Sequence, residues 1–314
     1  MSKWKWGLAA SLALPVMAQP IPTEQAEALA TLSGLSTEEV QSAMAGAEKN
    51  QKILDAIATP WEAKPWYQYQ PIFLTKERLE KGLAFWREHE ALLAKAEAEY
   101  QVPASVIVAI IGVETYYGRH MGTYPVRDAL YTLGFFYEPR APFFFKELGQ
   151  YLKLAKEQGW QQSPKGSYAG AMGMGQFIPS SYQHFAVDFD QDGKRDLFES
   201  PADAIGSVAN YFHEHGWQMG EPVLAKAEVK GQAPVSKGLE LDSTLGALAK
   251  AGVSPAIAMA EDTPAKLFTF ELKDSTDYQV AFHNFYVITR YNRSPLYARA
   301  VWTLASQLEQ AHGG

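Results

Sequence analysis

One carboxyl group stands at the end of the most apolar stretch of the chain. Glu114 follows residues 106–113, which are all apolar or glycine. This run predicts a buried helix, with Pro103 at its first position and Gly118 as a left-handed stop. Burial and the partial negative charge at a helix C-terminus both disfavour ionisation, so the pKa of Glu114 should be raised. The residues predict a general acid near neutral pH, the alternative being a carboxylate that points outward or pairs with Arg119.

Residues 188–199 carry oxygen-bearing side chains at the spacing of an EF-hand calcium loop. Three aspartates held this close would repel one another unless a cation neutralised them. The spacing therefore predicts a structural Ca²⁺ site, and the alternative is a solvated acidic loop. With Gly193 at the turn and a backbone carbonyl from Lys194, the expected ligands are Asp188, Asp190, Asp192, Lys194, Asp196 and Glu199.

Three other patterns lack the context that their chemistry needs. The glycine-rich segment 170–176 follows no predicted strand, and the chain contains no Gly-Lys-Ser/Thr, which argues against phosphate binding. His213 and His215 are two residues apart and would not share a helix face, so a zinc pair is not expected. Ser167 lies in Gly-Ser-Tyr-Ala-Gly rather than Gly-x-Ser-x-Gly, which leaves nucleophilic serine chemistry with little support.

The sequence offers Glu114 no obvious second acid. Between Gln158 and Val187 there is no Asp or Glu, and Asp128 is better read as a helix N-cap. Ordinary glycosidases need two carboxylates. An enzyme with one acid must take its second group from elsewhere, for example from an acetamido group of the substrate.

The composition is that of a globular protein. The 314 residues are 47% hydrophobic, with a formal net charge of −7 and no cysteine, so the chain can bury a large core without disulfides. Acidity without a basic tract argues against nucleic acid as a partner. The 16 Tyr, 16 Phe and 8 Trp residues suit either a core or stacking on sugar faces.

Residues 1–18 have the pattern of a cleaved secretory signal peptide. Lys3 and Lys5 precede an apolar segment, 7–14, and small residues lead to Gln19. The apolar segment is shorter than the roughly 20 residues of a membrane span, which argues against an uncleaved anchor. We therefore expect a soluble protein outside the cytoplasm.

The periodicity predicts an α+β fold that is predominantly helical. Residues 65–71, with two prolines and three aromatics, predict an extended strap. A long amphipathic helix over 75–100 should pack antiparallel to the Glu114 helix. Ser294 should cap the final helix. The expected division is 1–18 signal peptide, 19–100 N-terminal helical lobe, 101–217 catalytic core, 218–280 small αβ lobe and 281–314 C-terminal segment completing the core.

Four motifs, taken in order, resemble the lytic murein transglycosylase B family. They lie at residues 112–119, 166–180, 203–211 and 284–292. The resemblance covers nearly all of the chain after residue 18. It implies a lysozyme-like core with an additional helical lobe, a small β-containing lobe and a calcium loop. It also implies non-hydrolytic cleavage of peptidoglycan glycan strands, with no organic cofactor.

The resemblance also implies a mechanism. Glu114 would protonate the oxygen between N-acetylmuramic acid and N-acetylglucosamine and then accept the proton of the muramic 6-hydroxyl, which attacks C1 and leaves a 1,6-anhydro end. Ser167 and Gln176 would lie beside the acid as polar contacts to sugar or acetamido groups. Further substrate-binding positions, for which core packing is the alternative, are Tyr69, Tyr211, Tyr291, Asn292 and Tyr297.

Two departures from the family pattern matter. The family's namesake is a lipoprotein, whereas this chain has no cysteine for lipid attachment, so no membrane anchor is expected. The calcium loop is one residue longer before Asp203, which leaves open whether Glu199 or Asp203 closes the metal site. Rival functions are a goose-type lysozyme, which hydrolyses the same bond, and a non-catalytic murein-binding protein.

Overall fold

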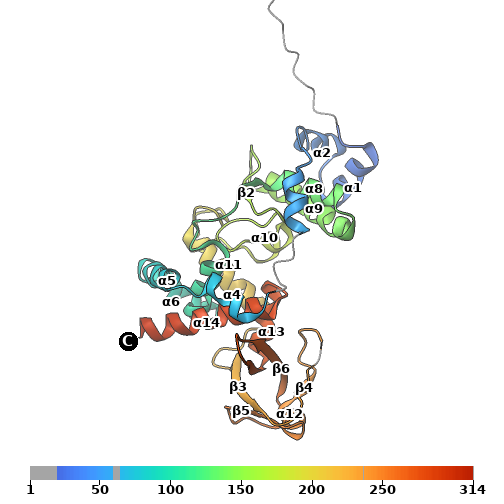
Figure 1. Ribbon diagram of the computed structural model, residues 1–314. Helices are drawn as coiled ribbons and strands as arrows, with labels where there is room; N and C mark the ends of the chain where they lie inside the picture. The colour runs from blue at the N-terminus through green and yellow to red at the C-terminus, as the bar shows by residue number, and fades with distance from the viewer. Residues whose placement is uncertain (1–19, 59–63, 236, 314) are drawn as a thin grey trace, which may run out of the picture.

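The computed structural model describes residues 20–58, 64–235 and 237–313. The predicted signal peptide, residues 1–18, lies outside the described residues. A helical lobe, a helical core and a small β-containing lobe follow one another from top to bottom of Figure 1. The predominantly helical α+β class is confirmed.

The helical lobe combines two segments that are far apart in the sequence (Figure 1). Its helices are α1 (Thr23–Ser33), α2 (Thr37–Ala43), α3 (Gln51–Ile57), α8 (Val126–Phe136) and α9 (Ala141–Glu157), with a 3₁₀ turn at Glu138–Arg140. α9 packs on both α1 and α8, and α3 packs on α8. The packing therefore differs from the expected lobe over 19–100, because α1 and α3 pack against α9 and α8 rather than against the helices between residues 64 and 100.

The core surrounds α7 (Ala104–Thr115), in which every residue except Glu114 is buried. Its other helices are α4 (Trp66–Phe73), α5 (Lys76–Glu88), α6 (Glu90–Tyr100), α10 (Pro179–Phe185), α11 (Pro201–Glu214), α13 (His283–Tyr291) and α14 (Pro295–His312). α14 packs along α7, which α5, α6 and α11 also contact. The buried helix predicted from the apolar run is confirmed.

The β-containing lobe is a five-stranded antiparallel sheet in the order β4-β6-β7-β3-β5. Its elements are β3 (Leu224–Val229), β4 (Ser243–Thr244), α12 (Leu245–Lys250), β5 (Val253–Pro255), β6 (Pro264–Glu271) and β7 (Thr276–Ala281). Leu267 pairs with Val280, and both lie in a small apolar cluster with Leu245 of α12. A separate two-stranded ladder, β1 (Tyr124–Pro125) with β2 (Lys165–Gly166), precedes the glycine-rich segment.

The extended strap predicted for residues 65–71 is wrong. The segment forms α4, with Pro65 at its N-cap and Pro71 inside the helix. Pro71 removes one backbone donor. The helix nevertheless buries Trp66 and Tyr69, and Trp66 meets Phe270 of β6 edge to face with 5.9 Å between ring centroids. Long-range burial therefore outweighs the local signal of the two prolines.

Three other local expectations need correction. The helix predicted over 75–100 breaks at His89 (φ −114°, ψ 24°), and α6 and α7 are bent by 114° instead of lying antiparallel. Asp128 is not an N-cap, because Pro125 precedes α8 and Asp128 lies in the first turn, paired with Arg127 at 2.9 Å. α7 ends at Thr115, and its left-handed C-cap is Tyr116 rather than Gly118.

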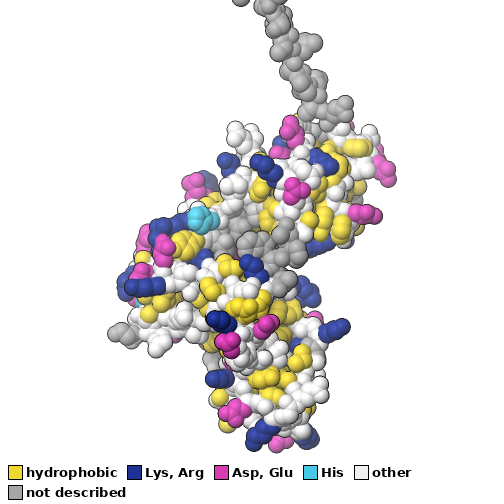
Figure 2. Space-filling view, viewed as in Figure 1, with side chains coloured by type: hydrophobic (Ala, Val, Ile, Leu, Met, Phe, Trp, Pro, Cys, Tyr) yellow, Lys and Arg dark blue, Asp and Glu magenta, His cyan; other side chains and the backbone are white. Residues whose placement is uncertain are grey.

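The N-cap expected at Ser294 is confirmed, since its hydroxyl accepts the Tyr297 N–H. On the face shown in Figure 2, acidic and basic side chains are interspersed. No single helix in the described ranges is long and apolar enough to cross a membrane, although the bent pair α6 and α7 passes by length and composition.

Candidate active site

Glu114 lies in the last turn of α7, where the helix meets the glycine-rich segment. The chain leaves the helix at Tyr116, and Tyr117 and Gly118 also have positive φ angles. Thr115 is fully buried and fixes this exit: its hydroxyl donates to the Met174 carbonyl at 2.8 Å and accepts the Gly118 N–H at 2.9 Å. The acid is therefore held on a turn that is tied to the glycine-rich segment.

Burial raises the pKa of Glu114 to about 7, and a hydrogen bond from Tyr297 opposes that rise. The Tyr297 hydroxyl, in a side chain only 3% exposed, donates to Glu114 Oε1 at 2.5 Å. Among the described residues, no other carboxylate contributes to the shift. A lone carboxyl group that titrates near neutrality can both give and take a proton.

The glycine-rich segment is a tight loop beside this turn. Ser167 Oγ accepts the N–H groups of Ala169 at 3.2 Å and Ala171 at 3.0 Å, which fixes the shape of the loop. Gln176 has φ 53° and donates to the carbonyls of Gly173 at 2.9 Å and Met121 at 3.2 Å. No hydrogen bond between described residues uses the Ser167 hydroxyl hydrogen or the Gln176 amide oxygen, so both can meet a ligand.

Tyr291 and Tyr297 lie close to the acid. The Tyr291 hydroxyl donates to the Gly175 carbonyl at 2.6 Å. Burial raises the pKa of Tyr291 well above its usual value, and the charge of Glu114 adds to that rise. Burial and Glu114 act in the same way on the pKa of Tyr297. Both phenols therefore stay protonated and serve as hydrogen-bond donors.

The three remaining positions differ from one another. Tyr211 is buried, donates to the Arg290 carbonyl at 2.7 Å and packs on Tyr291, which supports the core-packing alternative. Tyr69 is buried in α4, with its ring 6.3 Å from that of Trp66. Asn292 is exposed at the end of α13.

Two carboxylates of the acidic loop and one from the first turn of α11 lie close together. Asp188, Asp190 and Asp203 offer oxygens that all lie within 4.8 Å of one another. Asp203 is 1% exposed and accepts the N–H groups of Phe189 at 2.8 Å and Asp196 at 2.7 Å. Because Ca²⁺ binds oxygens at roughly 2.3–2.6 Å, three oxygens so spaced can surround one ion.

The other predicted ligands lie outside this cluster. Asp192 and Asp196 accept backbone N–H groups of the loop, from Lys194 at 2.9 Å and from Phe198 at 2.8 Å. Glu199 is exposed. Of the two residues that the sequence left open, the structure brings Asp203 to Asp188 and Asp190.

Comparison with known proteins decides the family. A family model described as Transglycosylase SLT domain matches residues 21–306. The chain belongs to this transglycosylase family. The membrane-bound lytic murein transglycosylase B of Escherichia coli (strain K12) is 40% identical to it over 292 residues, which are 88% of this chain and 80% of that protein.

Two solved structures are similar over more than nine-tenths of their length. Soluble lytic transglycosylase SltB1 from Pseudomonas aeruginosa is 45% identical, with a TM-score of 0.87 over 93% of this chain and 100% of that chain. The Escherichia coli lytic transglycosylase Slt35, in complex with calcium, is 37% identical, with a TM-score of 0.83 over 93% of each chain. The lysozyme-like fold expected from the motif resemblance is confirmed.

The protein is therefore a peptidoglycan-cleaving lytic transglycosylase. Sequence reasoning on this transglycosylase overlooked Thr115, which ties the acid's turn to Met174. The signal was present, since Thr115 lies inside the motif at 112–119. Only the structure supplies its partner, because Met174 is 59 residues away.

Proposed function

We propose that Glu114 carries out both proton transfers of the transglycosylase reaction. In the first, protonated Glu114 gives its proton to the oxygen that links N-acetylmuramic acid to N-acetylglucosamine. The bond from C1 to this oxygen breaks, and the N-acetylglucosamine end leaves as an alcohol. Positive charge then develops at C1 of the muramic ring, where the acetamido oxygen of the same sugar can shelter it.

In the second transfer, Glu114 is a carboxylate and acts as a base. It takes the proton of the 6-hydroxyl of the same muramic residue, whose oxygen attacks C1. A 1,6-anhydro ring forms, no water is consumed, and Glu114 regains its proton. Each cycle thus restores the starting protonation state.

The observation that carries this proposal is that, among the described residues, no second carboxylate contributes to the pKa shift of Glu114. Its pKa of about 7 leaves comparable amounts of acid and base near neutral pH. The hydrogen bond from Tyr297 favours the carboxylate that exists between the two transfers. An inverting hydrolase would need a second carboxylate to activate water.

Ser167 and Gln176 are proposed to hold the acetamido and hydroxyl groups of the reacting sugar. The Ser167 hydroxyl can donate, and the Gln176 amide oxygen can accept. Tyr291 can donate only by leaving the Gly175 carbonyl, so we assign it first to holding the loop.

Mass analysis of the fragments released from purified sacculi tests the proposal. A ring-closing reaction yields muramic ends one water lighter than hydrolysed ends. Hydrolysed ends would identify a goose-type lysozyme activity instead. Binding without release of any fragment, unchanged in Glu114→Gln, would identify a murein-binding protein.

A structural calcium ion is the second part of the proposal. The donor set is all oxygen, as Ca²⁺ prefers, and Asp203 is held in place by two backbone N–H groups. The related Slt35 is described in complex with calcium. Asp188, Asp190 and Asp203 would hold the ion, which would fasten the acidic loop to the first turn of α11.

We also propose that residues 1–18 direct export and that the mature enzyme works in the periplasm. The substrate of its relatives is murein, as the name of lytic murein transglycosylase B states. Cell fractionation with and without residues 1–18 tests this part. Retention of the full-length chain in the cytoplasm would contradict it.

A further inference from the structure

The helical lobe has a hollow of its own. Two adjoining depressions of about 490 and 390 Å³ lie between α2 and the C-terminal half of α9. Ligand sites have volumes of this order, about 300–1,000 Å³. The residues that line both depressions are Ser42, Ala43, Leu152, Ala155, Trp160 and Gln161. We propose that this lobe hollow binds an uncharged, N-acetylated sugar segment of the glycan strand whose neighbouring part occupies the active site, an inference that rests on the proposed function.

Trp160 gives the lobe hollow a rigid aromatic wall. Its backbone N–H donates to the Ala155 carbonyl at 2.9 Å. Its ring is held by the rings of Tyr151, Tyr182 and Phe198, with centroids at 6.2, 6.0 and 5.9 Å. A fixed ring that is still partly exposed offers apolar surface to a sugar face at little cost in side-chain entropy.

Hydroxyl and amide groups line the rest of the lobe hollow. Ser42, Gln161, Gln162 and Ser163 contribute them from α2 and from the segment after α9. Ser42 and Gln162 are exposed, and neither side chain forms a hydrogen bond with another described residue. Such groups can both donate to and accept from sugar hydroxyl and acetamido groups.

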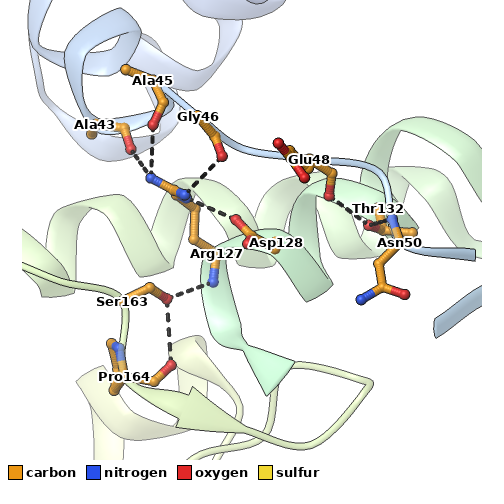
Figure 3. A network of polar contacts seen from close by, with 10 residues as sticks. All are labelled: Ala43, Ala45, Gly46, Glu48, Asn50, Arg127, Asp128, Thr132, Ser163 and Pro164. Atoms are coloured by element: carbon orange, nitrogen blue, oxygen red, sulfur yellow. Dashed lines mark hydrogen bonds and ion pairs between the residues drawn. The ribbon is translucent and has the colours of Figure 1, made fainter. Parts of the chain in front are cut away.

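The charged groups at the lobe hollow are already paired, which argues against an anionic ligand. Figure 3 shows the Arg127 guanidinium donating to the carbonyls of Ala43, Ala45 and Gly46 and to the Asp128 carboxylate. At the other end, Lys156 Nζ lies 2.8 Å from Glu39 Oε1. A phosphate or carboxylate would compete with Asp128 and Glu39 for these cations, whereas a neutral sugar would not.

The lobe hollow also lies close to the active-site loop. Ser163 lines it, and its hydroxyl oxygen accepts the Arg127 N–H, as the lower part of Figure 3 shows. The next carbonyl, that of Pro164, accepts the Val126 N–H at 3.0 Å. β2 then leads to Ser167. Four residues of extended chain span at most roughly 14 Å, so the edge of the hollow lies within that distance of Ser167. A polymeric substrate extends beyond the sugars at the acid and can reach it.

Filling the lobe hollow tests the proposal. Ser42→Trp places an indole in it at an exposed position. In a Glu114→Gln background, which prevents turnover, we expect this change to weaken binding of N-acetylglucosamine hexamer and of sacculi about tenfold. Gln162→Ala, which disturbs no packing, should weaken both about threefold.

Ser306→Trp is the matched control. It introduces the same side chain at an exposed position in a different hollow, of about 510 Å³, beside α14. Its affinities should equal those of the Glu114→Gln parent. The proposal is overturned if Ser42→Trp and Gln162→Ala also bind like the parent, while thermal melting shows that all variants are folded.

Activity with intact Glu114 separates this inference from the proposed function. Ser42→Trp should lower kcat/KM on sacculi about tenfold while leaving kcat on a soluble tetrasaccharide muropeptide unchanged. An equal loss of activity on sacculi and on the tetrasaccharide would contradict the proposal that the lobe hollow is a remote sugar-binding subsite. If the unaltered enzyme released no anhydro ends while Ser42→Trp still lost hexamer binding, the proposed function would fail and the sugar site would stand.

Discussion

Glu114 is the one acidic residue of α7, whereas the carboxylate oxygens of Asp188, Asp190 and Asp203 lie within 4.8 Å of one another at the start of α11. The side chain of Glu114 is only partly exposed, and desolvation raises its pKa to about 7. The second group consists of several acids that hold backbone N–H groups and need a cation to offset their mutual repulsion. In the proposed function, the same chemical group therefore carries a proton in one place and binds an ion in the other, and the number of neighbouring carboxylates distinguishes the two places.

Removing the lone acid should have the largest effect. Glu114→Gln keeps the shape of the side chain but cannot donate or accept the reacting proton. We expect kcat for release of soluble fragments from sacculi to fall about 10²- to 10⁴-fold. Glu309→Gln, on the exposed side of α14, should retain full activity. Substantial activity in Glu114→Gln would assign the chemistry to another group.

The same substitution should stabilise the fold at alkaline pH. The folded pKa of about 7 lies above the ordinary 4.5, so the native state binds more protons than the unfolded state between these values and loses stability as pH rises. Ionisation costs up to about 3 kcal/mol above pH 8. Denaturant unfolding should show Glu114→Gln more stable than the parent by that amount at pH 8, with no difference below pH 4.5.

The acidic loop should respond to metal rather than to pH alone. Millimolar Ca²⁺ at a hundredfold excess over Kd should add about 2.7 kcal/mol to the free energy of unfolding and raise Tm. Asp203→Asn should abolish this gain. Glu199→Gln is the matched control and should keep it, because Glu199 is exposed and outside the cluster. Loss of the gain in Glu199→Gln but not in Asp203→Asn would instead identify Glu199, at position twelve of the EF-hand pattern, as the ligand that completes the site.

The smallest effect should come from the partner of the acid. Tyr297→Phe removes the hydrogen bond that favours the carboxylate, so the pKa of Glu114 should rise by roughly one unit. The alkaline limb of the pH profile of kcat/KM should move upward by the same amount. Tyr211→Phe loses a bond to the Arg290 carbonyl instead and should leave the limb in place. If both variants moved the alkaline limb by the same amount, the limb would not reflect the pKa of Glu114.

The sequence predicted those features that depend on local pattern. The apolar run before Glu114 was enough to place the acid in a buried helix, and the spacing of Asp188 and Asp190 was enough to propose a cation. It did not predict α4, because the burial of Trp66 against Phe270 joins segments about two hundred residues apart. The sequence also did not choose between Glu199 and Asp203. Only the position of α11 shows which of the two carboxylates lies beside Asp188 and Asp190.

The helical lobe shows the same limit. Each of α1, α3, α8 and α9 has a helical pattern of its own, yet their pattern does not say which helices share a core. The packing places α8 and α9 with α1 and α3, across the part of the chain that forms α4 to α7. Domain boundaries that are given as continuous residue ranges cannot describe a lobe that consists of two separate segments of the chain.

Tyr297 lies on the last helix, 183 residues after the acid it contacts. During synthesis, a chain that has already built α7 still lacks this phenol, so its carboxyl group has neither its final neighbour nor the cover of α14. In the proposed mechanism, Glu114 therefore reaches its final environment as a proton donor only after α14 has packed against α7. A chain that ends before Pro295 would lack both Tyr297 and α14. Its active site would be incomplete, so peptidoglycan cleavage should begin only after α14 has been synthesised and packed.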